Sequence, residues 1–230
     1  MQITRRNSPN MNVGRQGRTP DFIACHITES TSLDGAISWL MNPEAQVSYH
    51  FVVARSGQVI QLVDIANTAW SNGTTNNSDS RDNRHSTIAA VRERRVSANL
   101  FTISIGFEGR HSEMQGGLVP AQLEAGSNLI RYIFEEVKRI YNFEIPLSRT
   151  NIIGHSEIAP RWKPNCPGRN FPFNEIIRGL NPPSNIAPWA EEAWKWATEN
   201  KITDGTRPTD NITRQETMTL LHRLYKFISK

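Results

Sequence analysis

Apolar residues along the first two thirds of the chain fall into short runs with either the two-residue period of β-strands or the 3.6-residue period of helices. Residues 21–27 (DFIACHI) form one strand-like run, and apolar residues alternate along residues 101–109 (FTISIGFEG). Two β-rich runs on either side of the Ser56–Gly57 pair predict a hairpin. The segment TNIIGH (150–155) predicts a last buried strand that ends at His155.

Helical periodicity separates these runs. Apolar positions predict one helix over residues 33–41, which stops at Asn42 and Pro43, and a longer one over residues 120–142 with a continuous apolar face. Residues 72–86 are too polar for a core element and predict a long surface loop. Strands mixed with helices, one pair of strands being a hairpin, predict an α/β fold with a mixed central sheet flanked by helices.

The pattern changes after residue 180. Three prolines lie within residues 180–189. They predict a proline-rich linker over residues 181–188, which separates a larger domain over 1–180, the candidate catalytic domain, from a small helical module over 189–230. Thr213 and Glu216 form a capping-box pattern at the start of its second helix. Two helices this short bury little surface alone, so we expect the module to pack on a partner: the first domain, another module or a second copy.

Composition narrows the classes of function. The chain of 230 residues has a net charge of +4, which favours an anionic partner such as nucleic acid or an anionic cell wall. Its basic residues are not interleaved with aromatic ones, which disfavours nucleic acid. No apolar run approaches the roughly 18 residues of a membrane span, and the start of the chain has no apolar signal-peptide region. With only Cys25 and Cys166, a disulfide framework is excluded.

Three residues form a candidate metal site. His26 and His155 end predicted strands, and Cys166 lies in the proline-broken segment GHSEIAPRWKPNCPG (154–168). Two imidazoles and a thiolate are ligands that zinc prefers, and three protein ligands leave a fourth position for water. Spacing alone leaves another interpretation open, in which the histidines are satisfied polar residues and the cysteine is a small buried apolar residue.

Four blocks in order, FIACHITES, SYHFVVARSGQVIQLV, ISIGFEG and GHSEIAPRWKPNCPG, resemble the zinc-dependent N-acetylmuramoyl-L-alanine amidases of the type 2 family. These enzymes share a fold with peptidoglycan recognition proteins, and the resemblance covers roughly residues 5–175. It implies that His26, His155 and Cys166 bind zinc, and that the bond cleaved joins muramic acid to the L-alanine of the stem peptide. Homologues without the cysteine often only bind peptidoglycan, so Cys166 favours an enzyme over a binding module.

The same resemblance implies roles for four further residues. Glu108 corresponds to the general base of some branches, and Tyr49 to a tyrosine that stabilises the oxyanion in others. We expect Glu108 to be the base and Tyr49 to donate a hydrogen bond. Lys163 lies three residues before Cys166, an unusual offset for a lysine that reaches the site, and Trp70 is expected to line the substrate groove. Each also has a structural interpretation, as a solvated carboxylate or lysine, or as a packed aromatic residue.

The C-terminal stretch resembles a single S-layer homology repeat, a module that binds secondary cell-wall polymers. This implies wall targeting, with association of copies through residues 185–230. The whole chain therefore resembles a phage or prophage endolysin, held in the bacterial cytoplasm until a holin releases it to the wall. The alternatives are a bacterial autolysin of the same chemistry, a cytoplasmic recycling amidase and a non-catalytic peptidoglycan-binding module. A generic helical hairpin packed on the catalytic domain is the alternative for the C-terminal stretch.

Overall fold

The computed structural model describes residues 1–73, 84–180, 186–203 and 212–229. The chain divides into two compact units, Met1–Leu180 and Asn181–Lys230. Most of the predicted surface loop and residues 181–185 of the predicted linker lie outside the described residues, and the described ends of that loop, Asn72 and Ser86, are buried.

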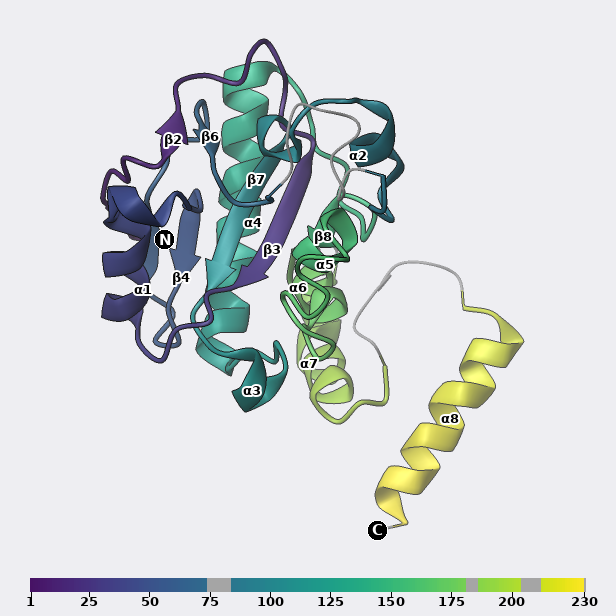
Figure 1. Cartoon of the computed structure of the whole chain (residues 1–230). Coiled ribbons are helices and arrows are strands. Elements are labelled where there is room, and N and C mark those ends of the chain that lie inside the picture. The colour runs from purple at the N-terminus through teal and green to yellow at the C-terminus, as the bar shows by residue number, and fades with distance from the viewer. Residues whose placement is uncertain (74–83, 181–185, 204–211, 230) are drawn as a thin grey trace. The chain divides into compact units, whose positions relative to one another are not determined.

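The first unit is built on a mixed sheet (Figure 1). Its strands pair in the order β1-β5-β4-β7-β3-β8, and β4 and β5 form the predicted antiparallel hairpin while the other neighbours are parallel. A small antiparallel pair, β2 and β6, lies outside this sheet. The strands are β1 (Ile3–Arg5), β2 (Met11–Asn12), β3 (Phe22–Ile27), β4 (Phe51–Val53), β5 (Val59–Gln61), β6 (Thr68–Ala69), β7 (Thr102–Phe107) and β8 (Ile152–Gly154).

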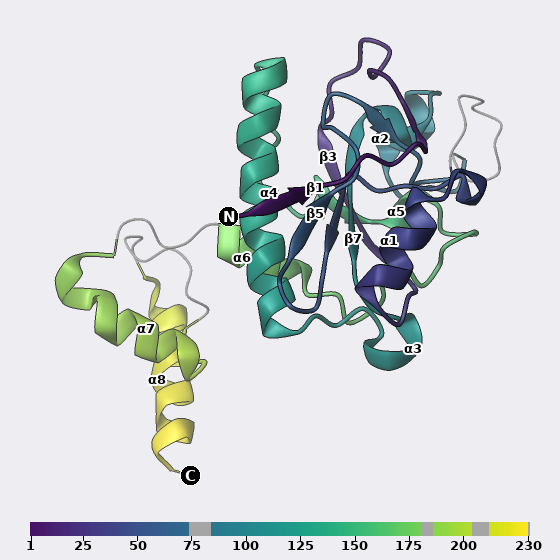
Figure 2. The same ribbon diagram turned by 90° about the vertical axis from the view of Figure 1, so that its left-hand side faces the viewer.

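Helices cover both faces of the sheet, which confirms the predicted α/β architecture (Figure 2). One face packs against α4 and α6, and α1 covers part of the other. The helices of this unit are α1 (Leu33–Met41), α2 (Ala89–Glu93), α3 (His111–Met114), α4 (Pro120–Tyr141), α5 (His155–Ile158) and α6 (Phe173–Leu180), with 3₁₀ turns η1 (Pro43–Ala45) and η2 (Ala98–Leu100). The two long predicted helices are therefore present at their expected positions.

Alternation along the central strands decides which residues face the core under α4. Ile23 and Cys25 of β3 belong to that core, together with Phe107 at the end of β7. Side chains alternate between the two faces of a strand, so His26 points to the opposite face. There it lies in register with Gly106 of β7. The α1 face of the sheet thus carries the polar and small residues of both strands.

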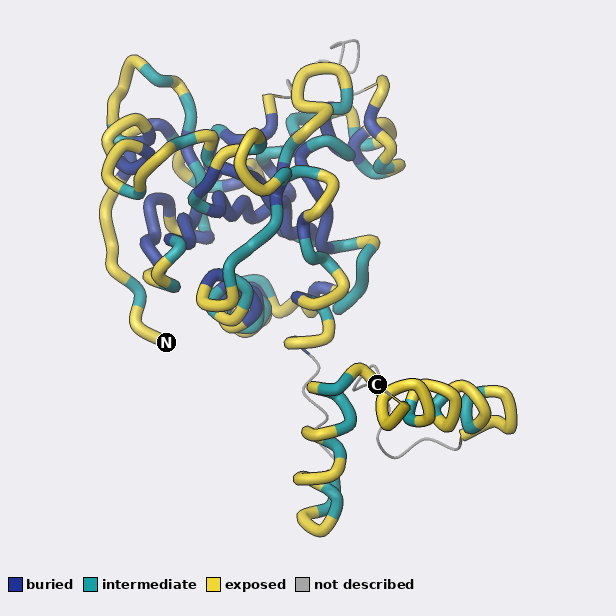
Figure 3. The backbone as a smooth tube through the Cα atoms, turned by 90° about the horizontal axis from the view of Figure 1, so that it is seen from below, coloured by how far each residue is buried: buried dark blue, intermediate teal, exposed yellow. Residues whose placement is uncertain are grey.

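The second unit contains η3 (Pro188–Ala190), α7 (Glu191–Glu199) and α8 (Arg214–Ile228). Thr213 caps α8 by accepting from the Glu216 amide, and the Glu216 carboxylate accepts from the Thr213 amide, which confirms the capping box. Ile202 is the one buried residue among those described in this unit. The helices α7 and α8 contain no buried residue, and their tube is coloured exposed or intermediate (Figure 3). Among the described residues, none of the helices combines the length and the apolar composition that a membrane-spanning helix requires.

Candidate metal centre

His26, His155 and Cys166 meet at the end of the sheet, although up to 140 positions separate them in the sequence. Their ligand atoms all lie within 4.8 Å of one another. The two Nδ1 atoms of His26 and His155 are 3.0 Å apart, and Cys166 Sγ lies 4.0 Å from His26 Nδ1. No other cluster of at least three histidine, cysteine or acidic side chains with metal-binding spacing occurs within the described residues.

Local hydrogen bonds hold His155 and Cys166 in place. The strand β8 ends at Gly154, one residue before the predicted end, because the Glu157 carboxylate accepts from the Gly154 amide at 2.7 Å and starts the turn of α5 at His155. The Arg149 guanidinium holds Glu157 in place at 2.8 Å. The Ser156 amide donates to the Cys166 carbonyl at 2.7 Å, which ties the cysteine loop to the same turn.

The electrostatics and spacing of the three side chains fit a zinc ion. Burial lowers the pKa of His26 well below 6.5 and that of His155 to about 4, so both imidazoles are neutral at neutral pH and keep a lone pair for a metal. Burial raises the pKa of the Cys166 thiol to about 11, and a divalent cation beside the sulfur would reverse this by stabilising the thiolate. Ligand atoms in a tetrahedral zinc site stand about 3.3–3.6 Å apart. The separations of 3.0 Å between the two Nδ1 atoms and 4.0 Å between Cys166 Sγ and His26 Nδ1 lie on either side of that range, and all three ligand atoms lie within 4.8 Å of one another.

His155 also has the outer partner that zinc-binding histidines usually have. Its Nε2 lies 3.2 Å from the carbonyl oxygen of Asn72. Because a carbonyl only accepts, Nε2 carries the proton, and Nδ1 is left with a lone pair 3.0 Å from His26 Nδ1.

A cavity of about 910 Å³ opens onto this cluster. His155, Cys166, Tyr49 and Lys163 line it, so the structure brings two further predicted site residues to the metal centre. His26 is fully buried and is not part of the cavity wall.

Among the cavity-wall residues that were not predicted from the sequence, one is acidic, Glu29, and two are large aromatic residues, Trp39 and Trp162. The two tryptophans are each 57% exposed, which is unusual for so large an apolar side chain. Trp39 lies on the predicted helix outside its apolar stripe, and Trp162 lies between two candidate ligands, His155 and Cys166, in the sequence. These two positions were the sequence features from which an exposed tryptophan near the metal site could have been predicted.

Tyr49 is held by close packing on the sheet. Its ring centroid lies 4.8 Å from that of His26, and the ring covers Gly106 so tightly that a Cβ atom there would come within 2.5 Å of Tyr49 Cδ2. Burial raises the pKa of Tyr49, so the phenol keeps its proton at neutral pH and can donate a hydrogen bond.

Glu108 and Trp70 lie away from the cavity wall. The Glu108 carboxylate accepts from the Arg55 amide at 2.8 Å, and its carbonyl accepts from Gln122 at 2.9 Å. The Trp70 indole donates to Asn12 Oδ1 at 2.5 Å, while its neighbour Ser71 lines the cavity. The roles of Glu108 as base and Trp70 as a substrate contact therefore stay predictions, without a contact to the cavity in their support.

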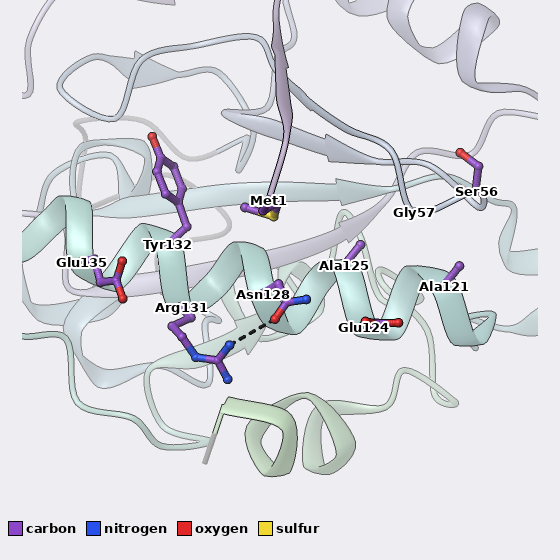
Figure 4. Close-up of a pocket in the computed structure, with 10 residues that line it drawn as sticks. All are labelled: Met1, Ser56, Gly57, Ala121, Glu124, Ala125, Asn128, Arg131, Tyr132 and Glu135. Carbon is purple, nitrogen blue, oxygen red and sulfur yellow. Dashed lines mark hydrogen bonds between the residues drawn. The ribbon is translucent and has the colours of Figure 1, made fainter. Parts of the chain in front are cut away.

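A second hollow of about 590 Å³ lies between α4 and the hairpin turn at Ser56 and Gly57 (Figure 4). Arg131 donates to Asn128 there at 3.1 Å, and Glu124 and Glu135 also line it. It has neither a cluster of metal ligands nor the paired exposed tryptophans of the first cavity, so the metal centre is the candidate active site.

Comparison with known proteins identifies solved structures with a similar fold and a protein family that the chain matches. Residues 16–169 match the N-acetylmuramoyl-L-alanine amidase family Amidase_2. The chain is 25% identical over 167 residues to N-acetylmuramoyl-L-alanine amidase A of Achromobacter lyticus, covering 67% of this chain and 80% of that protein. A solved selenomethionine AmpD derivative superposes with a TM-score of 0.54 at 20% identity, over 77% of this chain and 94% of AmpD. PlyL superposes with a TM-score of 0.50 at 18% identity, over 78% of this chain and 97% of PlyL. The chain therefore belongs to the N-acetylmuramoyl-L-alanine amidase family of peptidoglycan hydrolases.

Proposed function

We propose that this amidase is zinc-dependent and hydrolyses the amide bond between the lactyl group of N-acetylmuramic acid and the L-alanine of the stem peptide. The observation that carries the proposal is the buried His26, His155 and Cys166 cluster, whose spacing and neutral imidazoles suit zinc and which opens into a large cavity. A non-catalytic peptidoglycan-binding module is the alternative, and it is disfavoured because the thiol completes the ligand set.

When bound, zinc would polarise the scissile carbonyl and lower the pKa of its water to about 7. We assign the principal supporting role to Tyr49, because its protonated phenol belongs to the cavity wall and its ring packs on a ligand. The phenol would donate a hydrogen bond to the carbonyl oxygen as negative charge develops there. The Lys163 ammonium group, also in the cavity wall, would add positive charge beside the same oxygen. Glu108 is retained as a candidate base for direct comparison with Tyr49.

The cavity walls suggest how the glycopeptide is held. Trp39 and Trp162 expose large flat faces in the same cavity, and such faces suit the apolar faces of sugar rings and the stem-peptide backbone. Glu29 and Lys163 offer opposite charges for the amino and carboxylate groups of the stem. We therefore expect these residues, more than Trp70, to determine substrate affinity.

In the cell, we propose a role as a phage or prophage endolysin that remains in the host cytoplasm until holin-mediated release and then degrades the wall. A bacterial autolysin with the same chemistry is the alternative. The second unit, which resembles an S-layer homology repeat, would bind a secondary cell-wall polymer. The support for this part of the proposal is the pairing of a peptidoglycan amidase domain with a separate helical unit.

The test is digestion of purified peptidoglycan by the full chain, with mass spectrometry of the products. We expect stem peptides that begin with a free L-alanine, and loss of activity after chelation that zinc restores. Cys166→Ser should lose most of the bound zinc and the activity. Cys25→Ala is the matched control, because Cys25 lies one residue from a ligand but faces the core under α4. New reducing sugars in place of free stem peptides would refute the amidase, and full zinc occupancy in Cys166→Ser would refute the ligand assignment.

A further inference from the structure

The outer partner of His155 is a backbone carbonyl, that of Asn72, and it sets the direction of the imidazole. With Nε2–H bound to this oxygen at 3.2 Å, the Nδ1 lone pair faces the cluster, 3.0 Å from His26 Nδ1. A substitution of Asn72 cannot delete its carbonyl. The position of that oxygen instead depends on what holds the backbone of residues 71 and 72.

One side-chain oxygen accepts from both backbone amides of this segment. Asn99 Oδ1 accepts from the Asn72 amide at 2.9 Å, from the Ser71 amide at 3.2 Å and from the Ser71 hydroxyl at 3.3 Å. On the other side, the Asn72 carboxamide donates to the Thr102 hydroxyl at 2.8 Å. Two residues on other elements therefore fix the segment that carries the carbonyl.

Asn99 is itself held rigidly, because it lies in η2 and a buried guanidinium clamps this turn. Arg15 is 3% exposed, and its Nη1 donates to the carbonyls of Asn99 and Leu100 at 3.2 Å each and of Thr102 at 3.1 Å. Its Nε donates to the Ile65 carbonyl at 2.7 Å. A continuous chain of hydrogen bonds thus runs from Arg15 through Asn99 and the Asn72 backbone to His155.

We propose that Asn99 is a positioning residue of the metal centre, which aims His155 at the zinc through the carbonyl of Asn72. The inference rests on the zinc centre proposed above. Asn99 belongs neither to the ligand cluster nor to the cavity wall, and its side chain acts only as an acceptor in the contacts described. The acceptor oxygen, more than the amide group as a whole, is therefore the property that matters.

The experiment measures zinc affinity by chelator competition, and the visible spectrum of the Co²⁺-loaded protein, for the full chain and its variants. Partners of this kind typically contribute tenfold or more to metal affinity. Asn99→Ala should weaken zinc binding about tenfold and shift the Co²⁺ bands. Asn99→Asp keeps an acceptor oxygen at the same place and should restore both. Thr102→Val removes the other anchor of Asn72 with little change in shape, and should weaken zinc binding in the same direction even if Asn99→Ala does not fold.

Asn142→Ala is the control for a loss of stability alone. Asn142 ends α4 in a left-handed conformation (φ 50°), so its replacement destabilises the fold without touching the metal centre. It should leave zinc affinity and the Co²⁺ spectrum unchanged. Unchanged affinity and spectrum in Asn99→Ala and Thr102→Val would overturn the inference, as would an Asn99→Asp variant as impaired as Asn99→Ala. A wild-type chain that binds no zinc would instead refute the proposed zinc centre, and the inference with it.

Discussion

Replacing Gly106 by alanine adds one methyl group directly beneath the ring of Tyr49. The new Cβ would lie 2.5 Å from Tyr49 Cδ2 and 2.7 Å from Cε2. Carbon atoms in contact normally stand about 3.5–4.0 Å apart, so the ring has to move by roughly 1 Å. Because the ring also packs on His26, the displacement occurs at the metal centre itself.

The expected cost has two opposing parts. Overpacking of this kind destabilises a core by about 1–3 kcal/mol, while alanine is better than glycine in a strand by about 0.5–1 kcal/mol. We therefore expect the free energy of unfolding of Gly106→Ala to fall by about 1–2 kcal/mol in urea denaturation. A 1 Å misplacement at an active site costs up to about a hundredfold, so kcat/KM for a soluble muropeptide should fall about tenfold to a hundredfold.

A double variant separates strain from other effects of the methyl group. In a Tyr49→Ala background the ring is absent, so adding Gly106→Ala should be neutral or slightly stabilising. Activity should stay low in that background, because the phenol is missing. If Gly106→Ala alone retains wild-type stability and activity, Tyr49 does not lie over Gly106, and its assigned role loses its structural support.

Three further predictions test other parts of the proposal. Tyr49→Phe should keep its zinc but reduce kcat by about 10²-fold or more, the range for a lost oxyanion donor. This loss of kcat should exceed that of Glu108→Gln. The reverse order in muropeptide assays would restore Glu108 as the base. Burial, with the Arg15 guanidinium beside the ring, lowers the pKa of His50 well below 6.5, so the unfolded chain binds a proton there that the folded chain does not. Stability should therefore fall as pH drops below about 6.5, and His50→Asn should show a shallower dependence of the unfolding free energy on pH; an equal slope would contradict this. Removal of residues 181–230 should leave a monomer that cleaves soluble muropeptide but binds walls poorly, whereas light scattering that finds the full chain monomeric would exclude association through this unit.

Local pattern in the sequence determined much of the fold. The period-two runs and the long amphipathic helix could be predicted because each depends mainly on which face of a single element is apolar. The hairpin at Ser56 and Gly57 and the capping box at Thr213 and Glu216 are equally local. The three metal-ligand candidates were found from residue type, position at strand ends and family resemblance.

Tertiary structure decided how the site is arranged. Sequence alternation places Gly106 and Glu108 on one face of the strand predicted over residues 101–109. Only the packed structure shows that Tyr49 covers Gly106, while Glu108 follows the end of β7 and its carboxylate accepts from the Arg55 amide. Trp39 and Trp162 come from distant segments, and only folding places them in one cavity. The reason is physical: periodicity reports which face of an element is buried, but neighbours across a sheet depend on register and on loops that the apolar pattern does not encode.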